Sequence, residues 1–168
     1  MYERTVTEIH EALGSTATRI DHVGSTSISG IAAKPVIDIR ILVESYDPEA
    51  TYADPLSSLG FAFDHRDEGH VLFKGTRKRM RFNVHVVQKD EPDADSMVVF
   101  RDYLRSHPAE ARRYEVLKIG LAERHRGGDA YASAKSSYVA EVLRLATGGN
   151  TDERGPDPLG RAEVHPPE

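Results

Sequence analysis

The segment 36–43, Val-Ile-Asp-Ile-Arg-Ile-Leu-Val, constrains the fold of this chain more than any other part of the sequence. Five of its eight residues are β-branched, which is typical of a strand inside a β-sheet. Because side chains alternate along a strand, the apolar residues from Ile37 to Val43 are predicted to face the core, and Asp38 and Arg40 the opposite side. A carboxylate and a guanidinium in such a strand are costly to bury unless they are paired or used. The segment therefore predicts both a core strand and a candidate functional pair.

The remaining apolar patterns predict an α+β fold. Apolar residues recur at helical spacing in five segments, which are 5–13, 48–59, 95–106, 108–124 and 129–147. Extended patterns predict further strands at 17–23, 61–65, 70–74 and 80–88, with 61–65 and 70–74 forming a hairpin. Strands that come early and helices that come late favour α+β over a doubly wound α/β fold.

Length and composition indicate one domain, 1–147, followed by a disordered acidic Pro/Gly-rich tail, 148–168. The chain has 168 residues, no cysteine and no apolar run long enough to span a membrane, and its N-terminus lacks a signal-peptide pattern, so we expect a cytoplasmic protein. Of the net charge of −5, −3 comes from residues 151–168, which leaves a nearly neutral body. A nearly neutral body argues against a duplex nucleic-acid partner.

A glycine-serine loop follows the strand 17–23 and is the first candidate ligand site. Gly24 permits close approach of the backbone to a ligand, and it precedes Ser25, Thr26 and Ser27. Hydroxyls and amides of this loop can hold phosphate oxygens, above all if a short helix starts there. We expect Gly24, Ser25 and Thr26 to bind phosphate.

Several longer segments match a known family in order. They are His-Val-Gly-Ser-Thr-Ser at 22–27, Gly-Ile-Ala-Ala-Lys-Pro-Val-Ile-Asp-Ile at 30–39, Phe-Asn-Val-His-Val-Val at 82–87, Phe-Arg-Asp-Tyr-Leu-Arg-Ser-His-Pro at 100–108 and Tyr-Ala-Ser-Ala-Lys at 131–135. With these motifs the chain resembles the GrpB family of the nucleotidyltransferase-fold superfamily over residues 1–147. The resemblance implies a nucleotidyltransferase-like mixed β-sheet flanked by helices, with a helical C-terminal half.

The superfamily pattern also implies a metal site, from which this sequence departs. In that pattern, a Gly-Ser loop is followed about a dozen residues later by two acids one residue apart, and a later strand supplies a third acid. These acids hold two magnesium ions that align a nucleoside triphosphate. Here Asp38 takes the first place, Arg40 stands at the second, and the strand 80–88 has Asn83 and His85 but no acid. One carboxylate cannot offset the charge of two divalent ions.

Three interpretations of this degenerate site stay open. In the first, Asp38 and His85, with His22 as a further candidate ligand, bind one Mg²⁺, and Arg40 replaces the second ion against the phosphates. Asp38, Arg40 and His85 would then be the catalytic residues of a magnesium-dependent nucleotidyltransferase. In the second, Asp38 and Arg40 pair with each other or with neighbours, and the pocket binds a nucleotide or another phosphorylated small molecule without turnover. In the third, the site is vestigial and the domain binds a protein partner.

Further basic residues are candidates for binding phosphate. The resemblance implies that Lys34 and Lys135 reach the pocket, although a surface lysine before a rigid turn and a lysine lying over a helix stripe are equally simple interpretations. Arg81, inside a strand, is expected to contact a phosphate. His65 and His70 are expected to be surface residues without metal-ligand spacing. Relatives of this domain occur fused to dephospho-CoA kinase, so a coenzyme A precursor is an alternative ligand for a non-catalytic binding module.

Overall fold

The computed structural model describes residues 1–67, 69–124 and 129–148, without the side chains of 122–124 and 129–134. The expected tail from residue 149 onwards lies outside the described residues. No helix in the described part of the chain combines the length and the apolar character needed to cross a membrane.

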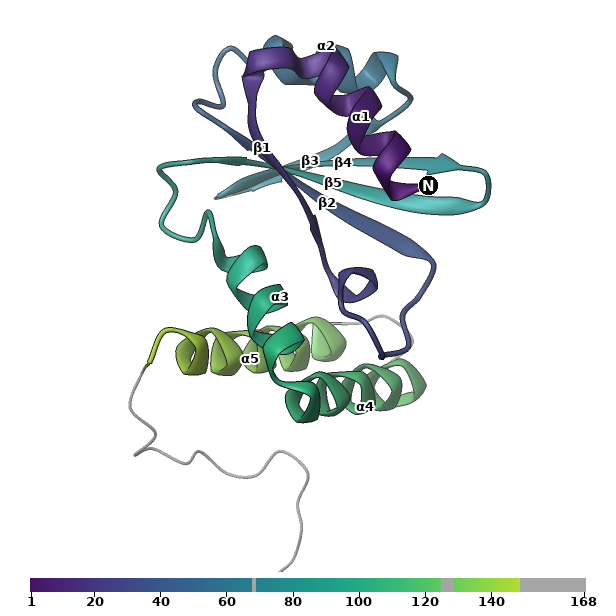
Figure 1. Cartoon of the computed structure of the whole chain (residues 1–168), viewed down its shortest axis with the longest axis vertical. Helices are drawn as coiled ribbons and strands as arrows, with labels where there is room; N and C mark the ends of the chain where they lie inside the picture. The colour runs from purple at the N-terminus through teal and green to yellow at the C-terminus, as the bar shows by residue number, and fades with distance from the viewer. Residues whose placement is uncertain (68, 125–128, 149–168) are drawn as a thin grey trace, which may run out of the picture.

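A mixed sheet of five strands forms the centre of the molecule (Figure 1). The strands are β1 (Ala17–Val23), β2 (Val36–Val43), β3 (Ala62–Asp67), β4 (His70–Arg77) and β5 (Met80–Gln88). They lie in the order β1-β2-β5-β4-β3, and β2 and β5 run parallel while the other neighbours run antiparallel. The strands at 17–23, 36–43 and 80–88 have the predicted bounds, whereas the hairpin strands extend further because β4 stays paired with β5 as far as Arg77.

The helices lie in two groups, one on each side of the sheet, and α3 leads from the sheet to the lower group (Figure 1). The α-helices are α1 (Tyr2–Leu13), α2 (Ala50–Ser58), α3 (Ser96–Ser106), α4 (Pro108–Arg124) and α5 (Asp129–Ala146). Two short 3₁₀ turns, η1 (Gly14–Thr16) and η2 (Ser25–Ser27), flank β1. Figure 1 shows α1 and α2 above the sheet and α3 to α5 as a separate layer below it. This arrangement confirms the predicted α+β class.

The main core fills the space between the sheet and the pair α1 and α2. Ile39 and Ile41 of β2 are fully buried and belong to one cluster with Ile9 of α1 and Leu56 of α2. The apolar alternation of β2 therefore faces the core as predicted, and the side of the sheet that carries Asp38 faces away from α1 and α2.

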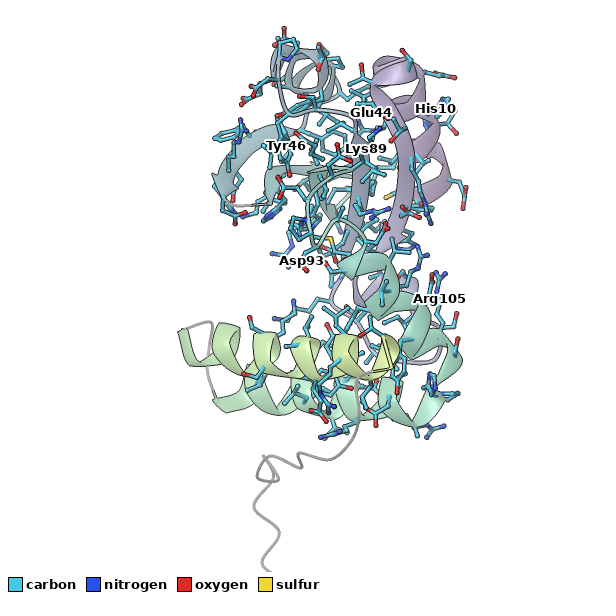
Figure 2. The ribbon with its side chains drawn as sticks, turned by 90° about the vertical axis from the view of Figure 1, so that its left-hand side faces the viewer. His10, Glu44, Tyr46, Lys89, Asp93 and Arg105 are labelled. Atoms are coloured by element: carbon cyan, nitrogen blue, oxygen red, sulfur yellow. The ribbon has the colours of Figure 1, made fainter. Side chains whose placement is uncertain are left out.

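A second, smaller core holds the C-terminal helices together and ties them to the loop after β1. Phe100 of α3, Tyr114 of α4 and Tyr138 of α5 pack with Ile28, which follows η2. Figure 2 shows Arg105 on α3 close to the junction of the sheet and the helical layer, with Asp93 in the segment that leads from the sheet to α3. The loop between β1 and β2 thus lies at the meeting point of both layers.

Candidate functional site

The loop after β1 brings the backbone of Gly24 against the side chain of Asp38. A Cβ atom on Gly24 would lie 2.2 Å from Asp38 Oδ2, and the φ angle of Gly24 is +69°. Both observations require glycine at this position, since other residues rarely adopt this backbone conformation and would collide with the carboxylate. In the structure the close neighbour of Gly24 is the side chain of Asp38, and the approach of a ligand to Gly24 stays a prediction.

Hydroxyl groups hold the η2 turn in place. Ser27 Oγ donates to the carbonyl of Gly24 at 2.6 Å, and Thr26 Oγ1 donates to the carbonyl of Val36 at 3.2 Å. His22 Nε2 lies 3.0 Å from Thr26 Oγ1. Thr26, expected to bind phosphate, thus uses its hydroxyl inside the loop. The half-buried Ser25 has no side-chain hydrogen bond to the described residues, which leaves its hydroxyl open to a ligand.

Asp38, Asn83 and His85 form a polar cluster on neighbouring parallel strands. Asp38 of β2 is in register with Asn83 of β5, and Asn83 Nδ2 donates to Asp38 Oδ1 at 2.8 Å. His85 Nε2 lies 3.6 Å from the same carboxylate oxygen, and the buried His85 Nδ1 has no hydrogen-bond partner among the described residues. The Asp38 side chain is 22% exposed, so a ligand can reach it. The structure therefore brings the expected pair Asp38 and His85 together.

His22 does not join this cluster. On β1 it is in register with Ile39, whereas Val23 is in register with Asp38. The His22 ring stacks on Tyr2 of α1 at a centroid distance of 4.3 Å. Burial lowers the pKa of His22 below its ordinary value, with a smaller contribution from the charge of Arg105. His22 therefore packs at the junction of α1, β1 and η2. The structure does not bring it into the cluster of Asp38, Asn83 and His85, although it was a candidate metal ligand.

Arg40 is fully buried and held entirely by protein groups. Its Nε and Nη2 atoms donate to Asp21 Oδ2 at 3.2 and 2.8 Å. Its Nη1 atom donates to Asp95 Oδ1 at 2.8 Å and to the carbonyl of Ala94. This placement differs from an Arg40 that contacts phosphates, because Asp21 lies opposite Arg40 in the β1–β2 register and takes up its charge. Of the three interpretations, pairing with neighbours describes this geometry, with Asp21 and Asp95 as partners in place of Asp38.

Three lysines from separate segments interact electrostatically near the loop between β1 and β2. Lys118 of α4, which the sequence did not single out, donates from Nζ to the carbonyl of Ala32 at 3.1 Å. Burial lowers the pKa of Lys118, and the positive charges of Lys135 and Lys34 lower it further, whereas Glu115 and, less strongly, Asp38 act in the opposite direction. The predicted residues Lys34 and Lys135 therefore share one electrostatic environment with Lys118 and Asp38. Only the packing of α4 against α5 and the loop places Lys118 there.

Arg81 lies beside the cluster on the open side of the sheet. It is exposed on β5, two positions before Asn83, and lines a hollow of about 410 Å³ together with Lys74, Thr76 and Asn83. Since Asn83 also binds Asp38, this hollow adjoins the Asp38 cluster. Arg81 is therefore placed to reach a ligand that extends from Asp38 along β5.

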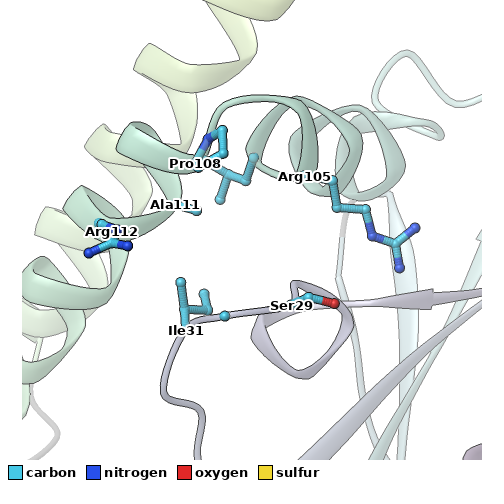
Figure 3. Close-up of a pocket in the computed structure, with 8 residues that line it drawn as sticks. Ser29, Ile31, Arg105, Pro108, Ala111 and Arg112 are labelled. Carbon is cyan, nitrogen blue, oxygen red and sulfur yellow. The ribbon is translucent and has the colours of Figure 1, made fainter.

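A second cavity, of about 420 Å³, lies on the helical side of the loop. Figure 3 shows Ser29 and Ile31 on the loop facing Arg105, Pro108, Ala111 and Arg112 of the helices. Arg105 Nε donates to the carbonyl of Ser27 at 2.9 Å, which ties α3 to η2. None of the predicted site residues lines this cavity.

The donor groups around Asp38 fit one magnesium ion and do not fit two. Mg²⁺ prefers oxygen ligands and is commonly held by one or two carboxylates together with substrate phosphates. Arg40 occupies the place of the second acid, and among the described residues Asp38 belongs to no group of three potential ligands. Within the described residues such a group occurs elsewhere, at His65, Asp67 and His70. The expectation that His65 and His70 lack metal-ligand spacing is therefore wrong.

Comparison with known proteins identifies the family. A family model described as GrpB protein matches residues 1–145. The chain belongs to the GrpB family. Its GrpB relatives include the UPF0157 protein BH1888 of Halalkalibacterium halodurans, 36% identical over 150 residues that span 87% of this chain and 76% of the relative. The Glutamate-rich protein GrpB of Alkalihalophilus pseudofirmus is 31% identical over 85% of this chain and 87% of the relative.

A solved GrpB structure shares the fold. The crystal structure of the conserved protein GrpB from Enterococcus faecalis superposes with a TM-score of 0.75, at 26% identity, over 86% of this chain and 89% of that chain. A dephospho-CoA kinase of Mycobacterium bovis is 28% identical over 85% of this chain, and the match spans 42% of the kinase. The resemblance to GrpB proteins and the mixed-sheet α+β fold are thus both confirmed.

Proposed function

We propose that this GrpB protein binds a nucleotide-type phosphate ligand at the site formed by η2 and Asp38, with Lys34, Lys118 and Lys135 as nearby cations. The observation that carries the proposal is the geometry at Asp38, whose carboxylate lies against the Gly24 backbone, accepts a hydrogen bond from Asn83 and stays 22% exposed. The lysines add positive charge with which phosphate oxygens can pair. A polyanion bound there would therefore stabilise the folded protein.

Each part of the pocket would have a distinct task. The backbone of η2 and the Ser25 hydroxyl would donate hydrogen bonds to phosphate oxygens. The lysines would balance the negative charge, and Arg81 would contact a part of the ligand that lies over β5. Asp38, oriented by the amide of Asn83, would hold one Mg²⁺ that the phosphates share. When bound there, the ion supplies positive charge between the carboxylate and the phosphates.

Binding without turnover is the activity that the donor groups favour. A two-ion transfer reaction needs a second carboxylate, and the second position holds Arg40, whose guanidinium is occupied by Asp21 and Asp95. A one-ion transferase is the second candidate, because His85 lies beside Asp38 with a buried ring nitrogen that has no partner among the described residues. In that case His85 would be the group that moves a proton.

The ligand panel should include coenzyme A precursors as well as nucleotides. One relative is named as a dephospho-CoA kinase, and this chain matches only 42% of its length. Dephospho-CoA carries a nucleotide-type phosphate chain, which is the chemistry that the lysines would recognise. Dephospho-CoA should therefore be tested beside ATP and the other nucleoside triphosphates.

Thermal melting of the purified protein with this panel, with and without Mg²⁺, tests the proposal. A ligand at 100 times its Kd contributes about 2.7 kcal/mol, which raises Tm by several degrees. Lys118→Met should abolish the shift, and Lys89→Met, which changes an exposed lysine paired with Glu44, should preserve it. If no ligand shifts Tm, the proposal is wrong, and a protein partner becomes the interpretation to pursue.

The magnesium dependence separates the two candidate activities. A shift that requires Mg²⁺ and is lost in Asp38→Asn would support the ion at Asp38. Release of pyrophosphate that disappears in His85→Gln while the binding shift persists would establish the one-ion transferase. Binding that persists without Mg²⁺ and in Asp38→Asn would show a metal-free binding module.

A further inference from the structure

The end of the β3–β4 hairpin brings together two imidazoles and a carboxylate. One ligand atom from each of His65, Asp67 and His70 lies within 4.8 Å of the others. His65 Nε2 is 3.5 Å from Asp67 Oδ2, and His70 Nδ1 is 2.6 Å from Asp67 Oδ1. Asp67 and His70 face each other across the hairpin register. The Tyr46 hydroxyl donates to the carbonyl of Gly69 at 2.6 Å, which fixes the turn between the two strands.

These separations are close to those of ligands around a small dication. Zinc bonds of 2.0–2.2 Å in tetrahedral geometry place neighbouring ligand atoms about 3.3 Å apart. The 3.5 Å between His65 Nε2 and Asp67 Oδ2 is close to this value, and His70 Nδ1, at 2.6 Å from the other oxygen of Asp67, needs to move away by less than about 1 Å. Asp67 is 50% exposed and His65 48% exposed, so water can complete the coordination. Two histidines and one carboxylate with open positions suit Zn²⁺ and similar first-row dications.

A further carboxylate orients one of the two imidazoles. Asp64 Oδ2 lies 2.7 Å from His65 Nδ1, on the side of the ring opposite Nε2. Lys74 Nζ in turn donates to the same oxygen of Asp64 at 2.9 Å. With the Nδ1–H of His65 directed to Asp64, its Nε2 carries the lone pair that a metal needs. Metal-binding histidines in proteins commonly donate their second ring nitrogen to a carboxylate in this way.

The ring of His70 packs against a neighbouring imidazole. The His70 ring stacks on the His85 ring at a centroid distance of 5.5 Å. The stacking fixes the orientation of the His70 ring, with Nδ1 directed to Asp67.

We propose that His65, Asp67 and His70 form a binding site for Zn²⁺ or a similar first-row dication, with Asp64 orienting His65. The site is separate from the pocket at Asp38 and does not depend on the function proposed for it. The two lie at neighbouring positions because His70 stacks on His85, and His85 approaches Asp38. A bound ion would link β3 to β4 at the end of the hairpin and stabilise the folded state by mass action.

The test measures metal binding to the full chain after treatment with a chelator. Equilibrium dialysis with Zn²⁺ gives the stoichiometry and Kd, and the visible ligand-field bands of Co²⁺ report the coordination. The chain has no cysteine, so thiolates do not compete. We expect one equivalent of Zn²⁺ at this site. His65→Gln and Asp67→Asn, which each remove a ligand, should weaken binding by at least about tenfold. Asp64→Asn, which changes only the group that orients His65, should weaken binding by about tenfold.

Two control variants distinguish this site from the rest of the chain. His107→Gln removes an exposed histidine far along the sequence, and Asp38→Asn alters the pocket of the proposed function. Both should leave the Zn²⁺ affinity unchanged. The proposal is overturned if the protein binds no Zn²⁺, or if His65→Gln and Asp67→Asn bind it as tightly as the unmodified chain does. Circular dichroism without metal verifies that each variant is folded.

Discussion

At the residue scale, Gly24 leaves no room for a side chain beside Asp38. We expect Gly24→Ala to lower the free energy of unfolding by about 1–3 kcal/mol for the backbone conformation, with a further loss from the collision with Asp38. Gly30→Ala is the matched control, since Gly30 also has a positive φ but open space around it. Urea unfolding of both variants separates the two contributions. Equal losses would show that Asp38 does not lie against the loop.

A second residue-scale prediction concerns pH and His22. Burial lowers the pKa of His22 in the folded protein below the ordinary 6.5 of the unfolded chain. The unfolded state therefore binds the proton more tightly, so this contribution is fully present above pH 6.5 and is lost as pH falls through the folded-state pKa. We expect the free energy of unfolding to decrease less between pH 7.5 and 5.5 in His22→Gln than in the unmodified protein.

The measurement is urea unfolding at several values of pH, with His10→Gln as the control for loss of an exposed histidine. The carboxylates titrate mainly below this window and contribute little to the difference. The same pH dependence in His22→Gln and in the unmodified protein would contradict the prediction.

At the element scale, β2 contains a charged residue that the neighbouring elements must neutralise. Arg40 on β2 joins Asp21 on β1 to Asp95 at the start of α3. We expect Arg40→Leu to cost about 3–5 kcal/mol, because Asp21 would keep a buried charge without its main partner. Arg4→Leu, which removes an exposed ion pair within α1, should cost less than about 1 kcal/mol. Thermal unfolding compares the two variants.

Two neighbouring arginines reduce the loss of stability expected for Arg40→Leu. Arg19 and Arg101 also lie near Asp21, at 3.0 and 3.6 Å, and would compensate part of the lost charge. An Arg40→Leu protein as stable as Arg4→Leu would show that these arginines suffice. In that case Arg40 would be available for a role in ligand binding after all.

At the scale of the whole molecule, α4 connects the helical layer to the loop between β1 and β2. Glu115 accepts a hydrogen bond from the backbone amide of Ala32, and Lys118 donates to the carbonyl of the same residue. We expect Glu115→Ala to free the loop and to speed hydrogen exchange in residues 29–34 several-fold, as follows from the loss of about 0.5–1.5 kcal/mol. The same substitution should also lower the affinity for the proposed phosphate ligand.

Hydrogen exchange measured by mass spectrometry tests this coupling, with Glu11→Ala on the exposed side of α1 as the control. Exchange in β2 should stay unchanged in both variants, because its central isoleucines are fully buried. Unchanged exchange at 29–34 in Glu115→Ala would show that α4 does not restrain the loop.

The strands and most helices follow from local patterns in the sequence. The period-two alternation of β2 and β5 gave both strands with their observed bounds, because burial on one face of a sheet selects that pattern directly. Asp38 and His85 were paired through the resemblance to the nucleotidyltransferase superfamily, whose pattern takes a further ligand from a later strand. Lys118 could not be found from the sequence, because its position depends on how α4 packs against α5 and the loop. The His65 group was missed because its ligands come together only through the hairpin register.

The sequence by itself determined the class of fold and the family. Periodicity and motif order are local properties, and they are readable along the chain. The tertiary structure decided what the charged residues do. It buried Arg40 between Asp21 and Asp95, and it brought lysines from three separate segments into one electrostatic environment with Lys118 at its centre. Electrostatic interactions depend on distance in space and on burial, and neither quantity is fixed by spacing along the sequence.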